Sequence, residues 1–168
     1  MDHLVRDSVI IDTGLGAFRA TFTACGLTRL DFPQTAGRNC RGGLRPPKTN
    51  PKAPLFIRTL SRQLQQYAAG KSVRWSVPLD LSTGTTFQQS VWRALRTIPR
   101  GETRSYGWVA RKVGRPGASR AVGAACGANP IPVIIPCHRV IAGDGSLGGF
   151  GGGLPMKRRL LQIEGVKV

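Results

Sequence analysis

Residues 131–141 read Ile-Pro-Val-Ile-Ile-Pro-Cys-His-Arg-Val-Ile, an apolar run that leads directly into a cysteine, a histidine and an arginine. Val and Ile at this density fill a β-strand or another buried segment. A thiol at the end of such a segment, with an imidazole beside it, can be held rigidly and activated as a nucleophile. Cys137 can equally be an inert buried cysteine, as most cysteines are, and His138 a turn residue. The rest of the chain has to decide between the two.

The chain is unusually basic. Its 168 residues carry 25 Lys and Arg against 8 Asp and Glu, a formal net charge of +17, and its pI is about 11.5. The excess is +7 in residues 1–80 (12 against 5) and +10 in residues 81–168 (13 against 3), so it belongs to a folded surface rather than to a tail. Such a charge indicates a polyanionic partner, most simply nucleic acid, with a merely basic surface as the alternative.

The cysteines form no Cys-x-x-Cys pair and no tight cluster with either histidine, so we expect no metal site and no cofactor. They are Cys25, Cys40, Cys126 and Cys137. The first residues lack the apolar core of a signal peptide, and no apolar run approaches membrane-spanning length. We therefore expect no membrane association and a reducing, cytoplasmic setting in which Cys137 stays a thiol.

The first half predicts a strand-rich domain over residues 1–82. Turn signals divide residues 8–32 into an antiparallel meander. Its expected core is Phe18, Phe22, Leu30 and Phe32. Residues 33–54 form a basic loop rich in Pro and Gly, most simply a connector. A helix is predicted from Leu55 to Ala69, with Leu55 among its packing residues, and a further strand over residues 73–81.

The second half, residues 83–168, predicts helices. Thr85-x-x-Gln88 resembles a capping box for the first. Ser105 can cap a second helix over residues 106–113, and a Gly/Pro turn separates it from a third over residues 118–126. This pair is a helix-turn-helix pattern. A last helix is expected over residues 155–164.

The third helix is rich in Ala and Gly, so its backbone can approach another surface closely. Packing within the protein explains this, but the net charge favours close approach to DNA, with phosphate and groove-shape contacts rather than base reading. The glycines of residues 147–153 similarly suggest backbone close to a flat ligand, or else a floppy loop.

Groups of residues across the second half carry a family likeness. They are Phe87-Gln88-x-x-Val91-Trp92, Ile98-Pro99-x-Gly101-x-Thr103-x-Ser105-Tyr106-Gly107, Ser119-Arg120-Ala121-Val122-Gly123, Asn129-Pro130, Pro136-Cys137-His138-Arg139-Val140, and Gly152-Gly153-Leu154-x-x-Lys157 with Leu160-Leu161-x-x-Glu164-Gly165. In this order and spacing they closely resemble the O6-alkylguanine-DNA alkyltransferases, the single-turnover DNA repair proteins. Residues 1–80 match only loosely.

The resemblance implies an α/β (α+β) fold, with a ribonuclease-H-like sheet domain and a mainly helical, winged-helix-like domain that carries the helix-turn-helix and the active site. Such proteins bind the minor groove of double-stranded DNA with little sequence preference and flip out O6-alkylguanine. A cysteine then takes the alkyl group and keeps it, so each molecule acts once. The expected state is a monomer, with cooperative binding along DNA left open.

The resemblance also assigns the chemistry. Cys137 would be the nucleophile, and His138 would take its proton through a water molecule. Glu164 would orient His138 and balance its charge. Asn129 would brace the turn that holds Cys137.

Further residues would face the DNA. Arg120 would fill the space that the flipped base leaves, and Tyr106 would assist the flip and donate a hydrogen bond to guanine N3. The backbone carbonyls of Cys137 and Val140 would accept from the guanine amino group. Ser119 is expected at the DNA-binding surface, and Arg115 adds a plausible phosphate contact in the turn of the helix-turn-helix.

Two positions depart from the family. Many members have Tyr where this chain has Phe150, and some have Ser at Gly151. Phe150 keeps an apolar wall but loses a hydroxyl, and Gly151 keeps a backbone N–H that can reach guanine O6. The following glycines predict a more mobile loop that admits bulkier alkyl groups.

Other functions fit less well. Non-catalytic lesion-binding proteins of this fold lack the cysteine. A plain helix-turn-helix regulator does not explain Cys137, His138, Asn129 and Glu164 together, and a helix of small residues reads bases poorly. A thiol hydrolase fits neither the charge nor the glycine-rich loop.

Overall fold

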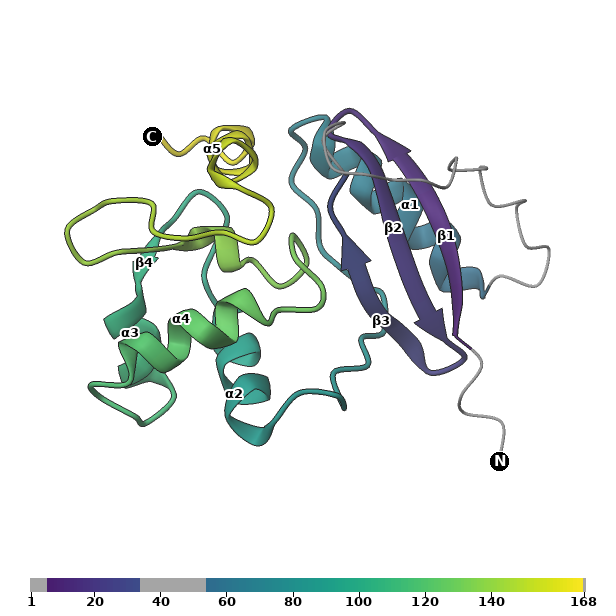
Figure 1. Ribbon diagram of the computed structural model, residues 1–168. Coiled ribbons are helices and arrows are strands. Elements are labelled where there is room, and N and C mark those ends of the chain that lie inside the picture. The colour runs from purple at the N-terminus through teal and green to yellow at the C-terminus, as the bar shows by residue number, and fades with distance from the viewer. Residues whose placement is uncertain (1–5, 34–53, 168) are drawn as a thin grey trace, which may run out of the picture. The chain divides into compact units, whose positions relative to one another are not determined.

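The computed structural model describes residues 6–33 and 54–167. The chain divides into two compact units, Met1–Asp80 and Leu81–Val168 (Figure 1). The first holds a sheet and a helix, and the second is mainly helical, which matches the predicted α/β class. The unit boundary lies close to the one predicted between residues 82 and 83.

The first unit is a three-stranded antiparallel sheet with one helix against it (Figure 1). Strands β1 (Asp7–Thr13), β2 (Gly16–Thr23) and β3 (Gly26–Asp31) lie in the order β1-β2-β3. Helix α1 (Leu55–Ala68) packs against β1 and buries Ile57, Leu60, Leu64 and Tyr67 at helical spacing. Of the predicted sheet core, Phe18, Phe22 and Leu30 are buried, and Phe32 is half-buried with its ring 5.8 Å from that of Phe18.

Two expectations for this unit are wrong. Leu55 is the first residue of α1 and is 78% exposed, because the helix begins before its apolar face meets the sheet. Residues 73–81 do not form a strand, since only Leu79 pairs there, in an isolated bridge with Leu27. Trp75 lies 5.8 Å from the ring of Tyr67, so the alternating pattern reflects packing of that side chain on α1 rather than sheet pairing. The basic loop of residues 38–52 lies outside the described residues.

The second unit contains four α-helices in its described part. They are α2 (Thr86–Leu95), α3 (Tyr106–Lys112), α4 (Ser119–Gly127) and α5 (Leu154–Ile163). The predicted capping box is confirmed, because Thr85 Oγ1 accepts from Gln88 N at 3.2 Å and Gln88 Oε1 accepts from Thr85 N at 2.9 Å. Ser105 caps α3 as predicted, accepting from Trp108 N at 3.1 Å.

Short pairings join segments of the second unit that are far apart in the sequence. Strand β4 (Arg104–Ser105) pairs in parallel with β5 (Val140–Ile141), which follows the 3₁₀ turn η1 (Cys137–Arg139). The Trp92 indole of α2 donates to the Ala125 carbonyl of α4 at 2.9 Å. A Cβ on Gly84 would lie 2.3 Å from the Trp92 ring, so only glycine fits there. The pairing of β4 with β5 therefore holds the start of α3 close to the segment that contains Cys137.

Candidate functional site

The apolar run before Cys137 forms a buried turn rather than a strand. Residues 131–140 are all buried, and Ile135 N donates to Ile131 O at 2.9 Å. Val133 has a φ of 74°, in the left-handed region that a β-branched residue adopts only under constraint. The surroundings therefore hold this turn in a strained conformation just before the cysteine.

Asn129 spans the turn with one side chain. Its Oδ1 accepts from Ile131 N at 3.0 Å, and its Nδ2 donates to Ile135 O at 2.8 Å. The same Nδ2 lies 3.1 Å from the sulfur of Cys137. The Asn129 amide, which the resemblance assigns as a brace, therefore bonds the backbone at Ile131 and Ile135 and also contacts the sulfur of Cys137.

Glu164 binds two buried side chains of η1. Its Oε1 lies 2.9 Å from His138 Nε2, and its Oε2 accepts from Arg139 Nε at 2.8 Å. Arg139 Nη2 also donates to Oε1 at 2.9 Å, so the arginine grips the carboxylate with two parallel bonds. These contacts join the end of α5 to the turn that contains Cys137.

This cluster has a defined charge at neutral pH. Burial lowers the pKa of His138 below its ordinary value, although its bond to Glu164 acts in the opposite direction. Burial alone would raise the pKa of Glu164, but the hydrogen bonds from His138 and Arg139 hold that pKa far below its usual range. A neutral His138 beside an ionised Glu164 carries its proton on Nε2, so its buried Nδ1 is the nitrogen that can accept a proton.

Cys137 is a protonated thiol at rest. Burial raises the pKa of its thiol, and the Asn129 bond and the charge of Lys157 counteract this only in part. The thiolate is the nucleophilic form, so reaction at this sulfur requires a group that removes the proton. His138, the adjacent residue, has a lowered pKa, so its neutral imidazole has the chemistry to accept such a proton.

Lys157 ties the last helix to the segment that follows Cys137. Its side chain is fully buried in α5, and its Nζ donates to the carbonyls of Val140, at 2.6 Å, and of Leu147. The ammonium also lies 5.8 Å from the centre of the Phe150 ring. A carbonyl oxygen has two lone pairs, so Val140 can still accept a second hydrogen bond.

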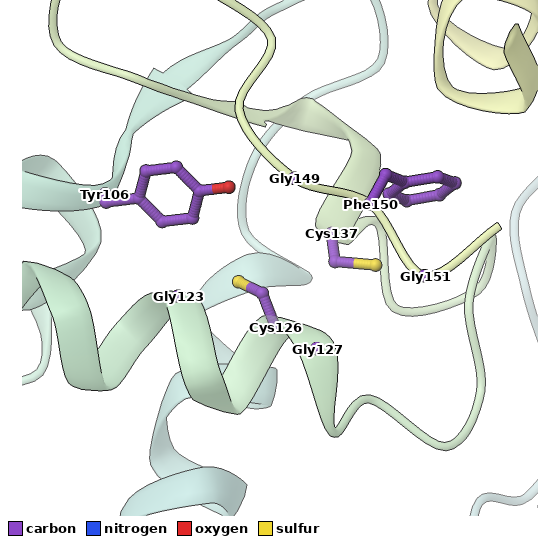
Figure 2. Close-up of a pocket in the computed structure, with 8 residues that line it drawn as sticks. All are labelled: Tyr106, Gly123, Cys126, Gly127, Cys137, Gly149, Phe150 and Gly151. Atoms are coloured by element: carbon purple, nitrogen blue, oxygen red, sulfur yellow. The ribbon is translucent and has the colours of Figure 1, made fainter. Parts of the chain in front are cut away.

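A cavity of about 350 Å³ opens beside the Cys137 sulfur. Figure 2 shows the residues that line it, four of which are glycines. They are Tyr106, Gly123, Cys126, Gly127, Cys137, Gly149, Phe150 and Gly151. Its volume lies at the lower end of the range for small-molecule sites, which suits a single flat ring system.

The structure brings only some of the predicted binding residues to this cavity. Tyr106, Phe150 and Gly151 line it together with Cys137. Burial raises the pKa of Tyr106, so its hydroxyl keeps its proton and can donate a hydrogen bond. Gly148 has a φ of +64°, and a Cβ there would lie 3.1 Å from the Tyr106 hydroxyl oxygen, so the loop needs glycine to pass the tyrosine.

The helix-turn-helix has one face with little side-chain bulk. Val122 and Ala125 of α4 are buried, and a Cβ on Gly107 of α3 would lie 3.6 Å from Ser119 Oγ. Small residues therefore do serve the packing of α3 on α4, which the sequence left as an alternative. The opposite face of α4 is exposed, and its residues are Arg120, Ala121, Ala124 and Gly127.

The other predicted DNA-facing residues lie outside the cavity lining. Arg120, at the start of α4, and Arg115, in the turn before it, are exposed, and Ser119 is half-buried. Val140 is buried, and its carbonyl bonds Lys157.

Neither metal ligands nor a membrane-spanning helix appear in the described part of the chain. Residues 6–33 and 54–167 hold no group of three His, Cys, Asp or Glu side chains arranged to bind a metal, and Cys40 and His3 lie outside those ranges. In the same ranges no helix has the length and apolar character needed to cross a membrane.

Sequence reasoning gave no role to Arg139, Lys157 or Cys126. Arg139 stands inside an apolar stretch, and a buried arginine needs an acidic partner. The acidic residues that follow it are Asp144 and Glu164, so the sequence offered a signal for this pairing. Lys157 stands three residues before Leu160, on the inward face of α5, which was a second usable signal. Nothing in the spacing of Cys126 indicates that it lines the cavity.

Comparisons with known proteins place this site in a family. Residues 86–166 match the family described as 6-O-methylguanine DNA methyltransferase, DNA binding domain. The methylated-DNA–protein-cysteine methyltransferase of Mycobacterium bovis is 59% identical over 102 residues, which cover 61% of each chain. The matched segment thus spans less than two thirds of that relative.

Two further comparisons extend over nearly the whole chain. The methylated-DNA–protein-cysteine methyltransferase of Methanosarcina barkeri is 42% identical over 155 residues, covering 92% of this chain and 94% of the relative. The crystal structure of Mycobacterium tuberculosis OGT in complex with DNA has a TM-score of 0.78 and 43% identity, covering 94% of this chain and 91% of that one. Both units therefore have counterparts in these relatives.

Proposed function

This chain belongs to the methylated-DNA–protein-cysteine methyltransferase family, and we propose that it repairs O6-alkylguanine, mainly O6-methylguanine, in double-stranded DNA. The alkyl group is transferred to Cys137 and stays there. The observation that carries this proposal is the position of Cys137. Its sulfur lines a cavity and touches Asn129, and the next residue is a neutral histidine paired with a buried carboxylate.

The chemistry is one displacement. The Cys137 sulfur attacks the alkyl carbon, so that a carbon–sulfur bond forms as the bond from carbon to guanine O6 breaks, and that electron pair goes to guanine. The thiol proton passes to His138 Nδ1 through a bridging water and ends on the released guanine. Glu164 stabilises the imidazolium that forms in between. The thioether is stable, so each molecule reacts once.

The cavity has to hold a base that has left the stack. Tyr106 donates to guanine N3, and Phe150 supplies an apolar wall where many relatives have tyrosine. The backbone carbonyls of Cys137 and Val140 accept hydrogen bonds from the guanine amino group. The backbone N–H of Gly151 donates a hydrogen bond to guanine O6. Lys157 holds the segments that carry Val140 and Phe150 in place.

The helix-turn-helix brings the DNA to this cavity. The exposed face of α4 has only small side chains after Arg120, which suits close approach to the minor groove with little sequence preference. Arg120 fills the space that the flipped guanine leaves in the base stack, while Arg115 and Ser119 contact the DNA backbone. We further infer that the protein acts as a monomer in the cytoplasm, with cooperative binding along DNA as an open question for titration on long duplexes.

The direct test uses duplex DNA with a labelled O6-methyl group. Label should move to the protein and stop at one equivalent, and Cys137→Ser should bind the duplex without taking label. Tight binding by the wild-type protein with all label left on the DNA would refute the proposal.

A second test isolates base flipping. Arg120→Ala should slow the repair of duplex DNA far more than the reaction with free O6-benzylguanine, which needs no flipping. Arg58→Ala, an exposed arginine of α1, is the matched control for the lost charge. Equal slowing of both reactions by Arg120→Ala would remove Arg120 from the flipping step.

A further inference from the structure

Cys126 is a second cysteine in the wall of the cavity that contains Cys137. It lies in the last turn of α4, between Gly123 and Gly127, which line the same cavity. Figure 2 shows its sulfur pointing from the helix into the space between Tyr106 and Cys137. The mechanism proposed above does not use this residue.

Few side chains limit the size of this cavity. Apart from Cys137 and four glycines, its lining consists of Tyr106, Cys126 and Phe150. A Cβ on Gly127, Gly149 or Gly151 would meet nothing within 4 Å, and the backbone at these positions does not require glycine. The glycines therefore mark open space, and Cys126 is the one side chain that α4 extends into it.

Transfer geometry makes this position matter. The sulfur of Cys137, the alkyl carbon and guanine O6 must lie nearly in line for the displacement. Every further carbon of a longer alkyl group then lies to the side of that line, in the space beside the acceptor sulfur. Cysteine extends only one heavy atom beyond its Cβ, so it leaves more of this space open than a longer side chain would.

Cys126 is poorly suited to accept an alkyl group itself. Burial, together with the neighbouring Cys137, raises the pKa of its thiol to about 12. It therefore keeps its proton at neutral pH, and a protonated thiol is a weak nucleophile that packs as a small apolar side chain.

We propose that Cys126 sets the upper size of the alkyl group that reaches Cys137, as a wall of the cavity and not as a second acceptor. This inference rests on the proposed alkyl transfer. From the sequence, we expected the mobility of the glycines at residues 152–153 to determine which alkyl groups are accepted. The Cys126 side chain takes that role in the present proposal.

The test compares Cys126→Ala, Cys126→Val and Cys126→Leu with the wild-type protein. Two duplexes are used that differ only in carrying O6-methylguanine or O6-benzylguanine, and the single-turnover rates give a benzyl-to-methyl ratio for each protein. We expect the ratio to fall in the order Ala, Cys, Val, Leu, and by about tenfold or more from Cys to Leu, since one methylene in a tight pocket is worth at least that much. Peptide mass analysis should find the alkyl group on Cys137 alone.

The controls separate this role from the proposed function. Cys25→Leu makes the same change at an exposed cysteine of the first unit and should keep the wild-type ratio. If Leu closes the cavity to both substrates, Ala and Val still define the trend. A ratio that is the same in all four proteins, or an alkyl group on Cys126, overturns the inference, whereas a wild-type protein that leaves the methyl group on DNA overturns the proposed function.

Discussion

The two units of this chain differ in what they bury. Among the described residues of the first unit, the buried polar side chains are Thr23 and Gln63, and both are neutral. Besides the thiol of Cys137, the second unit buries four side chains that can carry charge, namely His138, Arg139, Lys157 and Glu164. Burying charge is costly unless each group is paired, and here each of the four has a partner at hydrogen-bond distance.

The difference shows what holds each unit together. The sheet and α1 meet through apolar side chains that other apolar residues of similar volume could replace. In the second unit, Glu164, the residue that follows the last turn of α5, and Lys157 within α5 hold the residues that follow Cys137 through charged hydrogen bonds. The buried charges of the second unit therefore pair around the turn that contains Cys137.

The largest expected effect concerns the base. His138→Gln keeps a polar side chain of similar size but cannot take a proton at neutral pH. We expect the single-turnover rate of methyl transfer to fall by about 10²–10⁴-fold, the usual contribution of a positioned general base. Binding to the duplex and the thermal unfolding midpoint are measured alongside, and a wild-type rate in the folded variant would show that the buried cluster serves structure only.

Breaking the charge cluster should cost more stability than removing the neutral buried side chain Gln63 of the first unit. Glu164→Gln removes the carboxylate that pairs with His138 and Arg139 and leaves a buried guanidinium without its counter-charge. The free energy of unfolding should drop by about 3–5 kcal/mol, measured by urea denaturation. A drop no larger than that of a surface substitution would mean that the ion pair contributes little.

Acid should lower the unfolding free energy of the second unit, because the pKa values of His138 and Glu164 are lowered in the folded protein. The folded pKa of His138 lies below 6.5 and that of Glu164 below 4.5, so the unfolded chain binds more protons than the folded one as the pH falls below each value. The unfolding free energy is then highest above pH 6.5 and falls toward acid, by at most about 1.4 kcal/mol per pH unit and proton.

Tryptophan fluorescence can follow this loss in the second unit. The tryptophans of that unit are Trp92 and Trp108, and Trp75→Phe removes the one in the first unit. Urea titrations of this variant at a series of pH values give the profile. A free energy that stays constant from pH 7 to 4 would contradict the assigned charge states.

The smallest effect is expected for the neutral buried group of the first unit. Gln63 donates from Nε2 to Arg74 O at 2.7 Å and to Ser76 Oγ at 3.1 Å. Gln63→Leu removes these bonds without leaving a charge behind, and should lower the unfolding free energy by about 1 kcal/mol, measured as for Glu164→Gln. A loss as large as that of Glu164→Gln would erase the contrast between the units.

Much of the fold could be predicted because its signals are local. Side-chain caps mark the starts of α2 and α3, Gly114 follows the end of α3, and turn signals separate the three strands. The turn at residues 131–135 was harder, since Val and Ile in a row suit a strand as well as a buried turn. Its shape depends on Asn129, whose bonds cross the turn and are not visible in local propensity.

The site could be predicted only where residues matched a known pattern. Cys137, His138, Asn129 and Glu164 were named from the resemblance, and the structure places Asn129 against the sulfur and Glu164 against the histidine. The role of Cys126 depends on how α4 packs beside the turn, which is a long-range contact that spacing does not encode. Lys157 and Arg139 belong to the matching residues, but their partners lie 17 and 25 residues away along the chain.

In the proposed mechanism, the buried cluster prepares one of the four cysteine sulfurs for reaction. A direct measurement is peptide mass analysis of the wild-type protein after reaction with one equivalent of duplex DNA containing O6-methylguanine. We expect one methyl group, on Cys137, with Cys25, Cys40 and Cys126 unmodified. A methyl group on another cysteine, or methyl groups shared among several, would contradict it.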